Sequence, residues 1–218
     1  PLMVQGSGKK GLDAENMIAY QLGWRGSFGQ NLTSDISFFY HDYKDITRTE
    51  ITGGVFFDSN GFVILPGQVN NNLDAQSYGV EVAINMQVTD WWRNYLTYSF
   101  FKINTKPQAG HSLFFPNSDE NTAPQQIASW RSLFSLSKNI DFDFWLRYTD
   151  ETITNRRAID DYFDLDVRLG WRIYHGLELS VAGQNLIQTK HLEFDEGAFY
   201  PVASTVERGV YGKLVWNF

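Results

Sequence analysis

The stretch DDYFDLDVRLGWRI, residues 160–173, decides the fold class, because its side chains alternate between apolar and polar. One face of this segment would carry the apolar residues Phe163, Leu165, Val167, Leu169, Trp171 and Ile173. The other face would carry Tyr162, Asp164, Asp166, Arg168, Gly170 and Arg172. Successive side chains of a β-strand point to opposite sides. The segment is therefore predicted to be a strand with one apolar face and one charged face.

The same alternation recurs along the chain, and helical periodicity is almost absent. The apolar faces carry no charged residue, whereas the opposite faces carry charges of both signs. The further segments with this pattern are 16–28, 31–42, 75–89, 94–103, 125–137, 141–150, 177–185 and the closing strand of VERGVYGKLVWNF, 206–218. The sequence therefore predicts an all-β protein built from antiparallel strands.

The connections between these segments alternate between short and long. Short connections lie near 28–31, 89–94, 138–140 and 174–176, and long ones near 44–74, 104–123, 150–160 and 186–206. Every second connection of an antiparallel meander lies at the same end of the sheet. We therefore expect one rim of tight turns and one rim of large loops. The first long connection should contain its own hairpin, with DSNG at 58–61 as the turn.

Composition excludes several classes of protein. The chain has 218 residues, a net charge of −7 and no cysteine, which rules out disulfides and thiolate metal sites and argues against a nucleic-acid partner. The sequence contains no run of 18 apolar residues, so no membrane-spanning helix is expected. No motif of a nucleophilic, metal-dependent or cofactor-dependent enzyme is present. We therefore expect no enzymatic activity, no cofactor and no metal site. The acidic set Asp160, Asp161, Asp164 and Asp166 could bind a divalent cation, but a solvated loop explains it more simply.

Alternation alone does not say which way the apolar faces point. A soluble barrel or sandwich turns them inward onto a core, whereas an outer-membrane barrel turns them outward to lipid. Aromatic residues gather near strand ends, as in the two aromatic girdles of membrane barrels. At the short-turn rim these are Trp24, Phe28, Trp91, Trp92, Tyr174, Trp216 and Phe218, and toward the long-loop rim they are Tyr40, Tyr43, Phe101, Tyr148 and Phe163. This distribution favours the membrane barrel.

Several stretches together resemble a known family. They are GLDAENMIAYQLGWRG (11–26), NLDAQSYGVEVAINMQVTDWW (72–92), TAPQQIASWRSLFSL (122–136), YHGLELSVAGQNLIQTKHLEF (174–194) and ERGVYGKLVWNF (207–218). In this order they resemble the C-terminal part of the β-barrel of TonB-dependent outer-membrane receptors.

The resemblance implies an antiparallel transmembrane barrel of 22 strands, of which residues 1–218 would form the last nine or so. The N-terminal plug domain and the first strands would be absent from this chain, and residues 1–14 would belong to an outer loop. Short turns would be periplasmic and long loops extracellular. The family closes on an aromatic residue that the barrel-assembly machinery reads, so Trp216 and Phe218 are the expected assembly signal.

The resemblance also implies a function. The protein would lie in the outer membrane of a Gram-negative bacterium, surrounded by lipid and lipopolysaccharide, and would take up an iron–siderophore or similar scarce chelate. TonB would supply energy through the missing N-terminal part. Expected ligand contacts are Phe114, Phe115, Arg156, Arg157, His191, Phe194 and Tyr200. Two alternatives stay open: a passive porin or structural outer-membrane barrel, and a soluble β-barrel or sandwich that serves as a binding domain.

Overall fold

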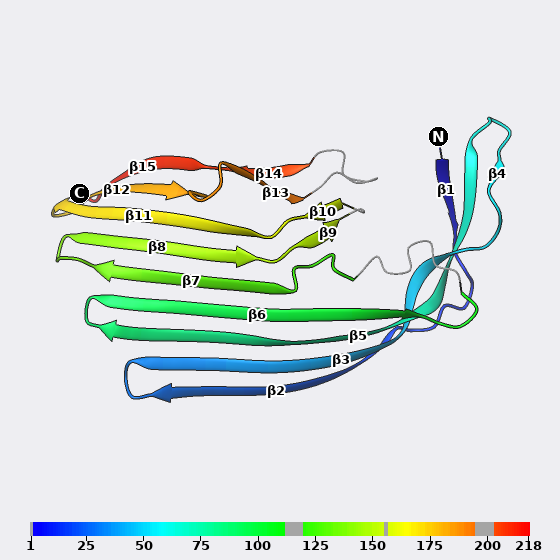
Figure 1. The fold of residues 1–218 in the computed structure, drawn as a ribbon, viewed down its shortest axis with the longest axis horizontal. Coiled ribbons are helices and arrows are strands. Elements are labelled where there is room, and N and C mark those ends of the chain that lie inside the picture. The colour runs from blue at the N-terminus through cyan, green and yellow to red at the C-terminus, as the bar shows by residue number, and fades with distance from the viewer. Residues whose placement is uncertain (1, 112–119, 155–156, 195–202) are drawn as a thin grey trace. The chain divides into compact units, whose positions relative to one another are not determined.

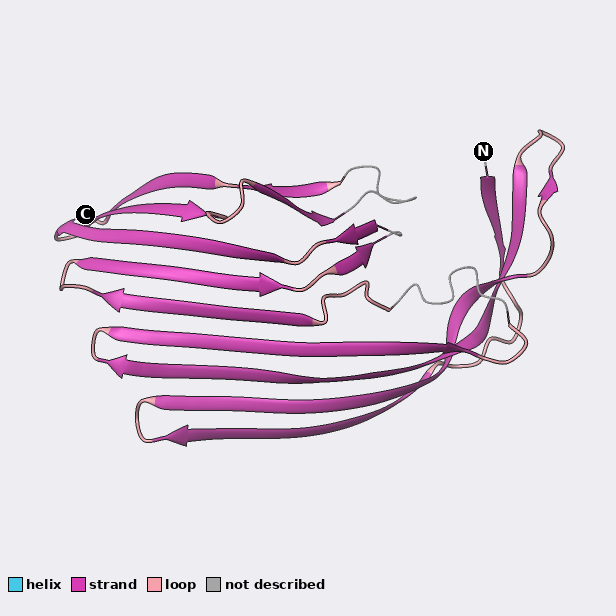
Figure 2. Cartoon of the chain, viewed as in Figure 1, coloured by secondary structure: helices cyan, strands magenta, loops and turns pink. Residues whose placement is uncertain are grey.

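The computed structural model describes residues 2–111, 120–154, 157–194 and 203–218, and all of its regular structure is β-strand (Figures 1 and 2). Consecutive strands pair in one meander, in the order β15-β12-β11-β8-β7-β6-β5-β3-β2. These strands are β2 (Asn16–Phe28), β3 (Leu32–Ile51), β5 (Val63–Thr89), β6 (Trp92–Pro107), β7 (Gln126–Ser135), β8 (Ile140–Thr149), β11 (Tyr162–Tyr174), β12 (Leu177–Gln184) and β15 (Gly209–Trp216). The described residues contain no helix long and apolar enough to cross a bilayer.

Six short strands accompany the meander. They are β1 (Leu2–Ser7), β4 (Phe56–Phe57), β9 (Thr152–Thr154), β10 (Arg157–Ile159), β13 (Lys190–Phe194) and β14 (Ser204–Glu207). β9 pairs with β10, and β13 with β14, in two separate antiparallel hairpins. β1 lies parallel to the first residues of β5, with Leu2 opposite Val63. The outer loop expected at residues 1–14 therefore contains a strand.

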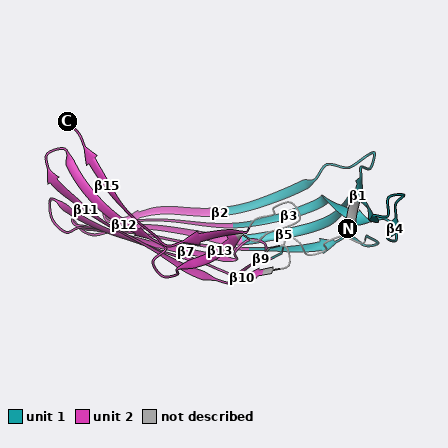
Figure 3. Ribbon diagram, turned by 90° about the horizontal axis from the view of Figure 1, so that it is seen from above, with its two compact units in different colours: residues 1–21, 39–78, 102–120 teal, residues 22–38, 79–101, 121–218 magenta. Residues whose placement is uncertain are grey.

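The chain divides into two compact units, coloured separately in Figure 3. Unit 1 contains residues 1–21, 39–78 and 102–120. Unit 2 contains residues 22–38, 79–101 and 121–218, and so holds part of every strand of the meander.

The pairing within unit 2 keeps the predicted faces in phase. Leu169 on β11 lies opposite Phe142 on β8 and opposite Val181 on β12, and all three belong to apolar faces. Arg168, the next residue, lies opposite Asp143 and Ala182 on the other side of the sheet. A slip of one residue would exchange the two faces of a strand, so this register confirms the faces predicted from the sequence.

The apolar faces are not packed into a core. The only buried hydrophobic side chains in the described ranges are Ile64, Leu73, Ala75, Ile159 and Ala182. By contrast, large side chains of the apolar faces stand exposed, among them Leu169, Val181 and Leu214. So many large apolar side chains exposed on one face are unusual for a monomeric soluble protein. The soluble barrel or sandwich with an inward core therefore does not describe this sheet.

Aromatic side chains lie at both ends of the unit 2 strands. At the short-turn end, rings pair between Trp24 and Phe28, whose centroids are 5.7 Å apart, and between Trp216 and Phe218, 6.1 Å apart. Toward the other end, Tyr148 and Phe163 face each other across β8 and β11 with their ring centroids 4.9 Å apart. This distribution agrees with the two aromatic belts expected of a membrane barrel.

In unit 1 the long connections are shorter than the sequence suggested. β3 continues to Ile51 and β5 already begins at Val63, so much of the expected loop 44–74 is strand. Polar side chains support this part of the ladder: the amide of Asn71 donates to the carbonyl of Asp45 at 2.6 Å. Because the segment lacks apolar alternation, periodicity could not reveal it. The hairpin with its turn at DSNG is confirmed, with Phe56 opposite Ile64 and Gly61 at φ 80°.

Candidate functional site

The candidate site is the polar face of unit 2, where charged side chains of neighbouring strands alternate in sign. On β11, Asp164 lies opposite Arg147 of β8, and Arg168 lies opposite Asp143. On the other side of β11, Arg172 lies opposite Glu178 of β12. Opposite charges placed across strands attract each other, and ion pairs form both between opposite residues, as in Arg168–Asp143, and diagonally, as in Arg172–Asp141. Together these pairs form a ladder.

Three arginines of β8 and β11 hold this ladder together. Arg147 Nη1 lies 2.8 Å from Asp166 Oδ2, and its guanidinium carbon lies 4.3 Å from the centre of the Trp145 ring. Arg168 bridges two strands, with Asp143 at 3.3 Å and Glu178 at 2.6 Å. Arg172 lies 2.6 Å from Asp141. Each side chain is partly exposed, so these pairs fix side-chain positions more than they stabilise the fold.

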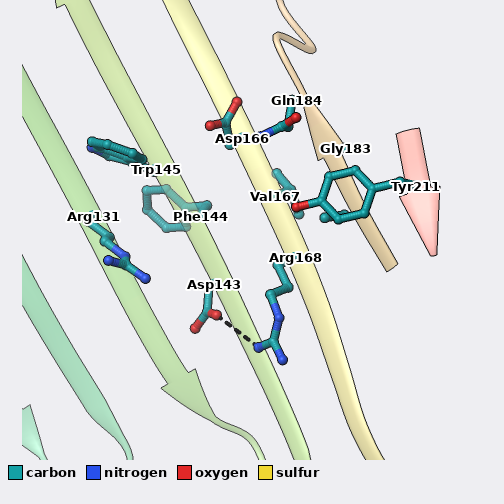
Figure 4. Close-up of a pocket in the computed structure, with 11 residues that line it drawn as sticks. Arg131, Asp143, Phe144, Trp145, Asp166, Val167, Arg168, Gly183, Gln184 and Tyr211 are labelled. Atoms are coloured by element: carbon teal, nitrogen blue, oxygen red, sulfur yellow. Dashed lines mark hydrogen bonds and ion pairs between the residues drawn. The ribbon is translucent and has the colours of Figure 1, made fainter. Parts of the chain in front are cut away.

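A hollow of about 220 Å³ lies over this ladder (Figure 4). Its charged and polar lining comes from Arg131, Asp143, Asp166, Arg168, Gln184 and Tyr211. Among the described residues no carboxylate forms an ion pair with Arg131, and Figure 4 shows its guanidinium apart from the bonded pair Asp143–Arg168. The hollow therefore presents one cation without an ion-pair partner beside apolar side chains such as Trp145, which suits an anionic solute.

Two tryptophans on the apolar faces have their indole N–H groups satisfied by polar residues of the same face. Trp130 Nε1 donates to Asn94 Oδ1 at 2.9 Å, and Trp92 Nε1 donates to Ser132 Oγ at 2.8 Å. Asn94 and Ser132 are buried beneath the rings. In hydrocarbon no water is present to bond an indole N–H, and an unpaired N–H is costly there. Asn94 and Ser132 remove this cost by accepting the hydrogen bonds.

Unit 1 has a polar cluster of its own, beyond the segment 31–42 predicted to cross the membrane. His111 Nδ1 contacts Glu50 Oε2, and Asn70 donates to the other oxygen of Glu50 at 3.1 Å. The hydrogen bond with His111 holds the pKa of Glu50 below its usual value, against a smaller opposing effect of burial. Similarly, hydrogen bonds from the hydroxyl and the backbone N–H of Thr47 lower the pKa of Glu15. These contacts join β3 to β5 through Glu50 and Asn70, and join the residue before β2 to β3 through Glu15 and Thr47.

Of the ligand-contact residues predicted from the sequence, His191 is the one whose side chain is described. It lies on β13 with its side chain only 6% exposed, and its ring stacks on Tyr162 with the centroids 4.2 Å apart. Phe114, Phe115, Arg156 and Tyr200 lie outside the described residues. Arg157 begins β10 and Phe194 ends β13, and their side chains lie outside the description as well.

The predicted assembly signal lies at the short-turn end of unit 2. Trp216 ends β15, and both Trp216 and Phe218 are exposed on the apolar side. The backbone N–H of Asn217 donates to the carbonyl of Gly176 at 2.7 Å, which fastens the chain end to the turn between β11 and β12.

Sequence reasoning missed the partners within the ladder and the role of Arg131. A signal was present only between β11 and β12, because their short turn fixes which residues lie opposite one another, whereas a long connection separates β8 from β11. Counting outward from the turn at 174–176 would have placed Arg172 beside Glu178. The contact of His191 with Tyr162 had no such signal, since a long connection separates the two residues.

Several solved structures with the same fold are receptors or transporters by their descriptions. The chain is 15% identical to the ferripyoverdine receptor of Pseudomonas aeruginosa bound to ferripyoverdine (TM-score 0.69), covering 95% of this chain and 28% of that one. It is 14% identical to the FrpB iron transporter of Neisseria meningitidis (TM-score 0.70), covering 98% and 33%. It is 17% identical to the ferric yersiniabactin uptake receptor of Yersinia pestis (TM-score 0.68), covering 94% and 30%.

This chain thus spans about a third or less of the structures that it matches. At these identities the likeness establishes the fold alone. No curated protein matches the sequence. The family model described as "TonB dependent receptor-like, beta-barrel" matches residues 3–186, most of the chain. The chain belongs to the TonB-dependent receptor family, a family of receptors and transporters, and forms part of its β-barrel.

Proposed function

We propose that this chain is the C-terminal part of the barrel of a receptor in the outer membrane of a Gram-negative bacterium. The receptor takes up an iron–siderophore or a similar scarce metal chelate, with energy delivered by TonB to a plug domain outside this chain. One observation carries the proposal: a sheet of the receptor family has one charge-free exposed face and one face of paired charges. Such a sheet suits a wall between lipid and a wet lumen.

The membrane contacts follow from the two faces. Outer-membrane lipid covers the apolar face, and the aromatic belts lie at the two interfaces, with lipopolysaccharide around the outer one. The two edge strands, β2 and β15, would leave backbone groups unpaired in hydrocarbon, at several kcal/mol for each group. Pairing with further strands of the same barrel removes this cost. Trp216 and Phe218 present the signal that the barrel-assembly machinery reads.

The cargo class is supported by the described relatives and by the polar face. The structures of similar fold include receptors for ferripyoverdine and ferric yersiniabactin by their own descriptions. On this chain, Arg131 is the described residue of the hollow best suited to an anionic chelate. The residues Phe114, Phe115, Arg156, Arg157, His191, Phe194 and Tyr200 remain the proposed contacts at the outer loops.

Growth and uptake test the function. Deleting the gene should abolish growth on one iron chelate as sole iron source, and collapse of the proton gradient should stop uptake of that radiolabelled chelate. Uptake that continues without the gradient would instead show a passive porin, the second candidate. If no chelate depends on the gene, the transport proposal is wrong.

A matched pair of variants tests the hollow. Arg131→Gln removes a cation without a carboxylate partner, whereas Arg172→Gln on the same face removes one already paired with Asp141. We expect the first to weaken binding of an anionic chelate to cells about tenfold, as loss of a charged hydrogen-bond donor typically does, and the second to leave it nearly unchanged. Equal effects would place the ligand away from Arg131.

A further inference from the structure

A carboxylate and an imidazole lie face to face where β11 begins and β13 passes. Asp164 Oδ1 is 3.6 Å from His191 Nδ1, and His191 Nε2 is 3.4 Å from Glu193 Oε1. One possible ligand atom from each of these three residues lies within 4.8 Å of the others. All three residues belong to unit 2.

Two of these groups are buried, and each has one atom without a hydrogen-bond partner. The side chain of His191 is 6% exposed and that of Asp164 is 8% exposed. Neither Asp164 Oδ1 nor His191 Nδ1 makes a hydrogen bond, and these two atoms are the ones that face each other. Buried polar atoms nearly always have a partner. Their separation also exceeds that of an ordinary N–H···O bond, about 2.7–3.2 Å, so the pair has room for a shared partner.

The surroundings hold both groups in place but leave these two atoms free. Arg147 Nη2 approaches only the other oxygen of Asp164, at 3.8 Å, and its guanidinium is already engaged by Asp166 at 2.8 Å. Tyr162 stacks on the imidazole with an interplanar angle of 24°, which fixes the orientation of the ring. Asp164 Oδ1 and His191 Nδ1 therefore lie 3.6 Å apart, held in place and without a hydrogen-bond partner of their own.

We propose that Asp164, His191 and Glu193 bind a divalent first-row transition-metal ion. Asp164 Oδ1 and His191 Nδ1 are the two buried ligands, and the carboxylate of Glu193, on an exposed residue, turns in as the third. Ligands of tetrahedral zinc at about 2.0–2.1 Å are separated by about 3.4 Å, close to the 3.6 Å observed. One imidazole with carboxylates and no thiolate suits zinc and its neighbours rather than calcium or magnesium.

The ion would have a structural consequence. β13 forms a hairpin with β14, and this hairpin is separate from the large sheet. A metal held by β11 and β13 ties the hairpin to the sheet at the end where the long connections leave it. This role does not depend on which cargo the receptor carries, so the site can be tested with the metal alone.

Zinc titration of the detergent-purified receptor, stripped with a chelator, tests the site. We expect one Zn²⁺ to bind for each chain and to raise the unfolding temperature. Asp164→Asn and His191→Ala should each weaken binding at least about tenfold, because even groups that only orient a metal ligand cost 10–100-fold when removed. Glu193→Gln should weaken it less, since Glu193 is exposed and water can take the place of its carboxylate. His175→Ala, at the exposed turn between β11 and β12, is the matched control and should bind as the wild type does.

The outcomes separate the alternatives. If the wild type binds no Zn²⁺, or if Asp164→Asn and His191→Ala bind as tightly as the wild type, the site does not exist. If His191 and Asp164 only contact each other and bind no metal, replacing either residue should change the unfolding temperature by the same amount with and without Zn²⁺. The nearly isosteric Asp164→Asn guards against misfolding: its unfolding temperature without metal should match that of the wild type, while the rise caused by Zn²⁺ is lost.

Discussion

Replacing Leu169 by arginine tests whether the apolar face meets hydrocarbon. Leu169 lies five residues before Tyr174 at one aromatic belt and six residues after Phe163 at the other. With about 3.3 Å per residue and a strand tilt of about 40°, these separations are about 13 Å and about 15 Å along the membrane normal. The apolar band of an outer-membrane barrel is about 25 Å tall, so Leu169 lies near its middle.

The expected penalty follows from this depth. Arginine on the lipid face costs about 2–4 kcal/mol at the midplane and about 0–1 kcal/mol near the interfaces. The side chain of Leu169 is 49% exposed, and its cross-strand neighbours Phe142 and Val181 are apolar. No carboxylate on this face could pair with the new charge. We therefore expect Leu169→Arg to lower the free energy of unfolding by about 3 kcal/mol, measured by denaturant unfolding of the receptor folded into lipid vesicles.

Thr97→Arg is the matched control. Thr97 lies five residues after Trp92, at the same depth as Leu169, but on the polar face opposite Ser129. There an arginine meets water, so its cost should stay below about 1 kcal/mol. Leu169→Met, which keeps the apolar volume, should also cost less than about 1.5 kcal/mol. If Leu169→Arg and Thr97→Arg cost the same, the apolar face does not lie in hydrocarbon and the membrane assignment fails.

Three further changes have definite expected results. Asn94→Ala leaves the indole N–H of Trp130 without its acceptor and should cost about 1–3 kcal/mol; in a Trp130→Phe background most of this cost should vanish, and additive costs would contradict the contact. Gly176→Ala should destabilise by more than about 1 kcal/mol, because φ is +78° and an added Cβ would lie 2.1 Å from a carbonyl oxygen; an unchanged denaturation midpoint would disprove this strain. The lowered pKa of Glu15 means that its bonds with Thr47 stabilise the fold at neutral pH and are lost as the pH falls below 4.5. Limited proteolysis should therefore cleave ahead of β2 faster in acid, and Thr47→Val, which removes the hydroxyl but keeps the backbone N–H bond, should reduce that pH dependence.

The sequence contained enough to predict the meander and its two faces. Strand β2 matches the predicted segment 16–28, and the tight turn at 174–176 is where β11 meets β12. This success has a physical reason. In a sheet with lipid on one side and water on the other, apolar and polar side chains must alternate along the whole length of each strand that crosses the bilayer. The sequence of such a strand therefore shows the complete pattern. The strand extensions of unit 1 escaped prediction because their sequence lacks apolar alternation.

The candidate sites were harder to predict because they depend on partners from different strands. Arg168 carries no motif, and its role follows from the register that places Asp143 opposite it and from the reach of its side chain along β12 to Glu178. Asp164 was considered with its acidic neighbours along the chain, whereas the structure joins it to His191 across a long connection. Such contacts depend on the conformation of the long connection, which the alternation of residues along the sequence does not predict.

The ion-pair ladder limits where the wall itself can attract an anion. On the polar face of β7, β8, β11, β12 and β15, the carboxylates are Asp141, Asp143, Asp164, Asp166 and Glu178, and the cations are Arg131, Arg147, Arg168, Arg172 and Lys213. The three arginines of β8 and β11 engage all of these carboxylates. Paired charges present little net field to a solute, because each is cancelled within a few ångströms. Within the described residues of this face, only Arg131 and Lys213 remain to attract an anionic chelate, and the buried pair of Asp164 and His191 favours a cation instead. The proposed cargo contact at Arg131 and the proposed metal ligands Asp164 and His191 therefore rest on different groups.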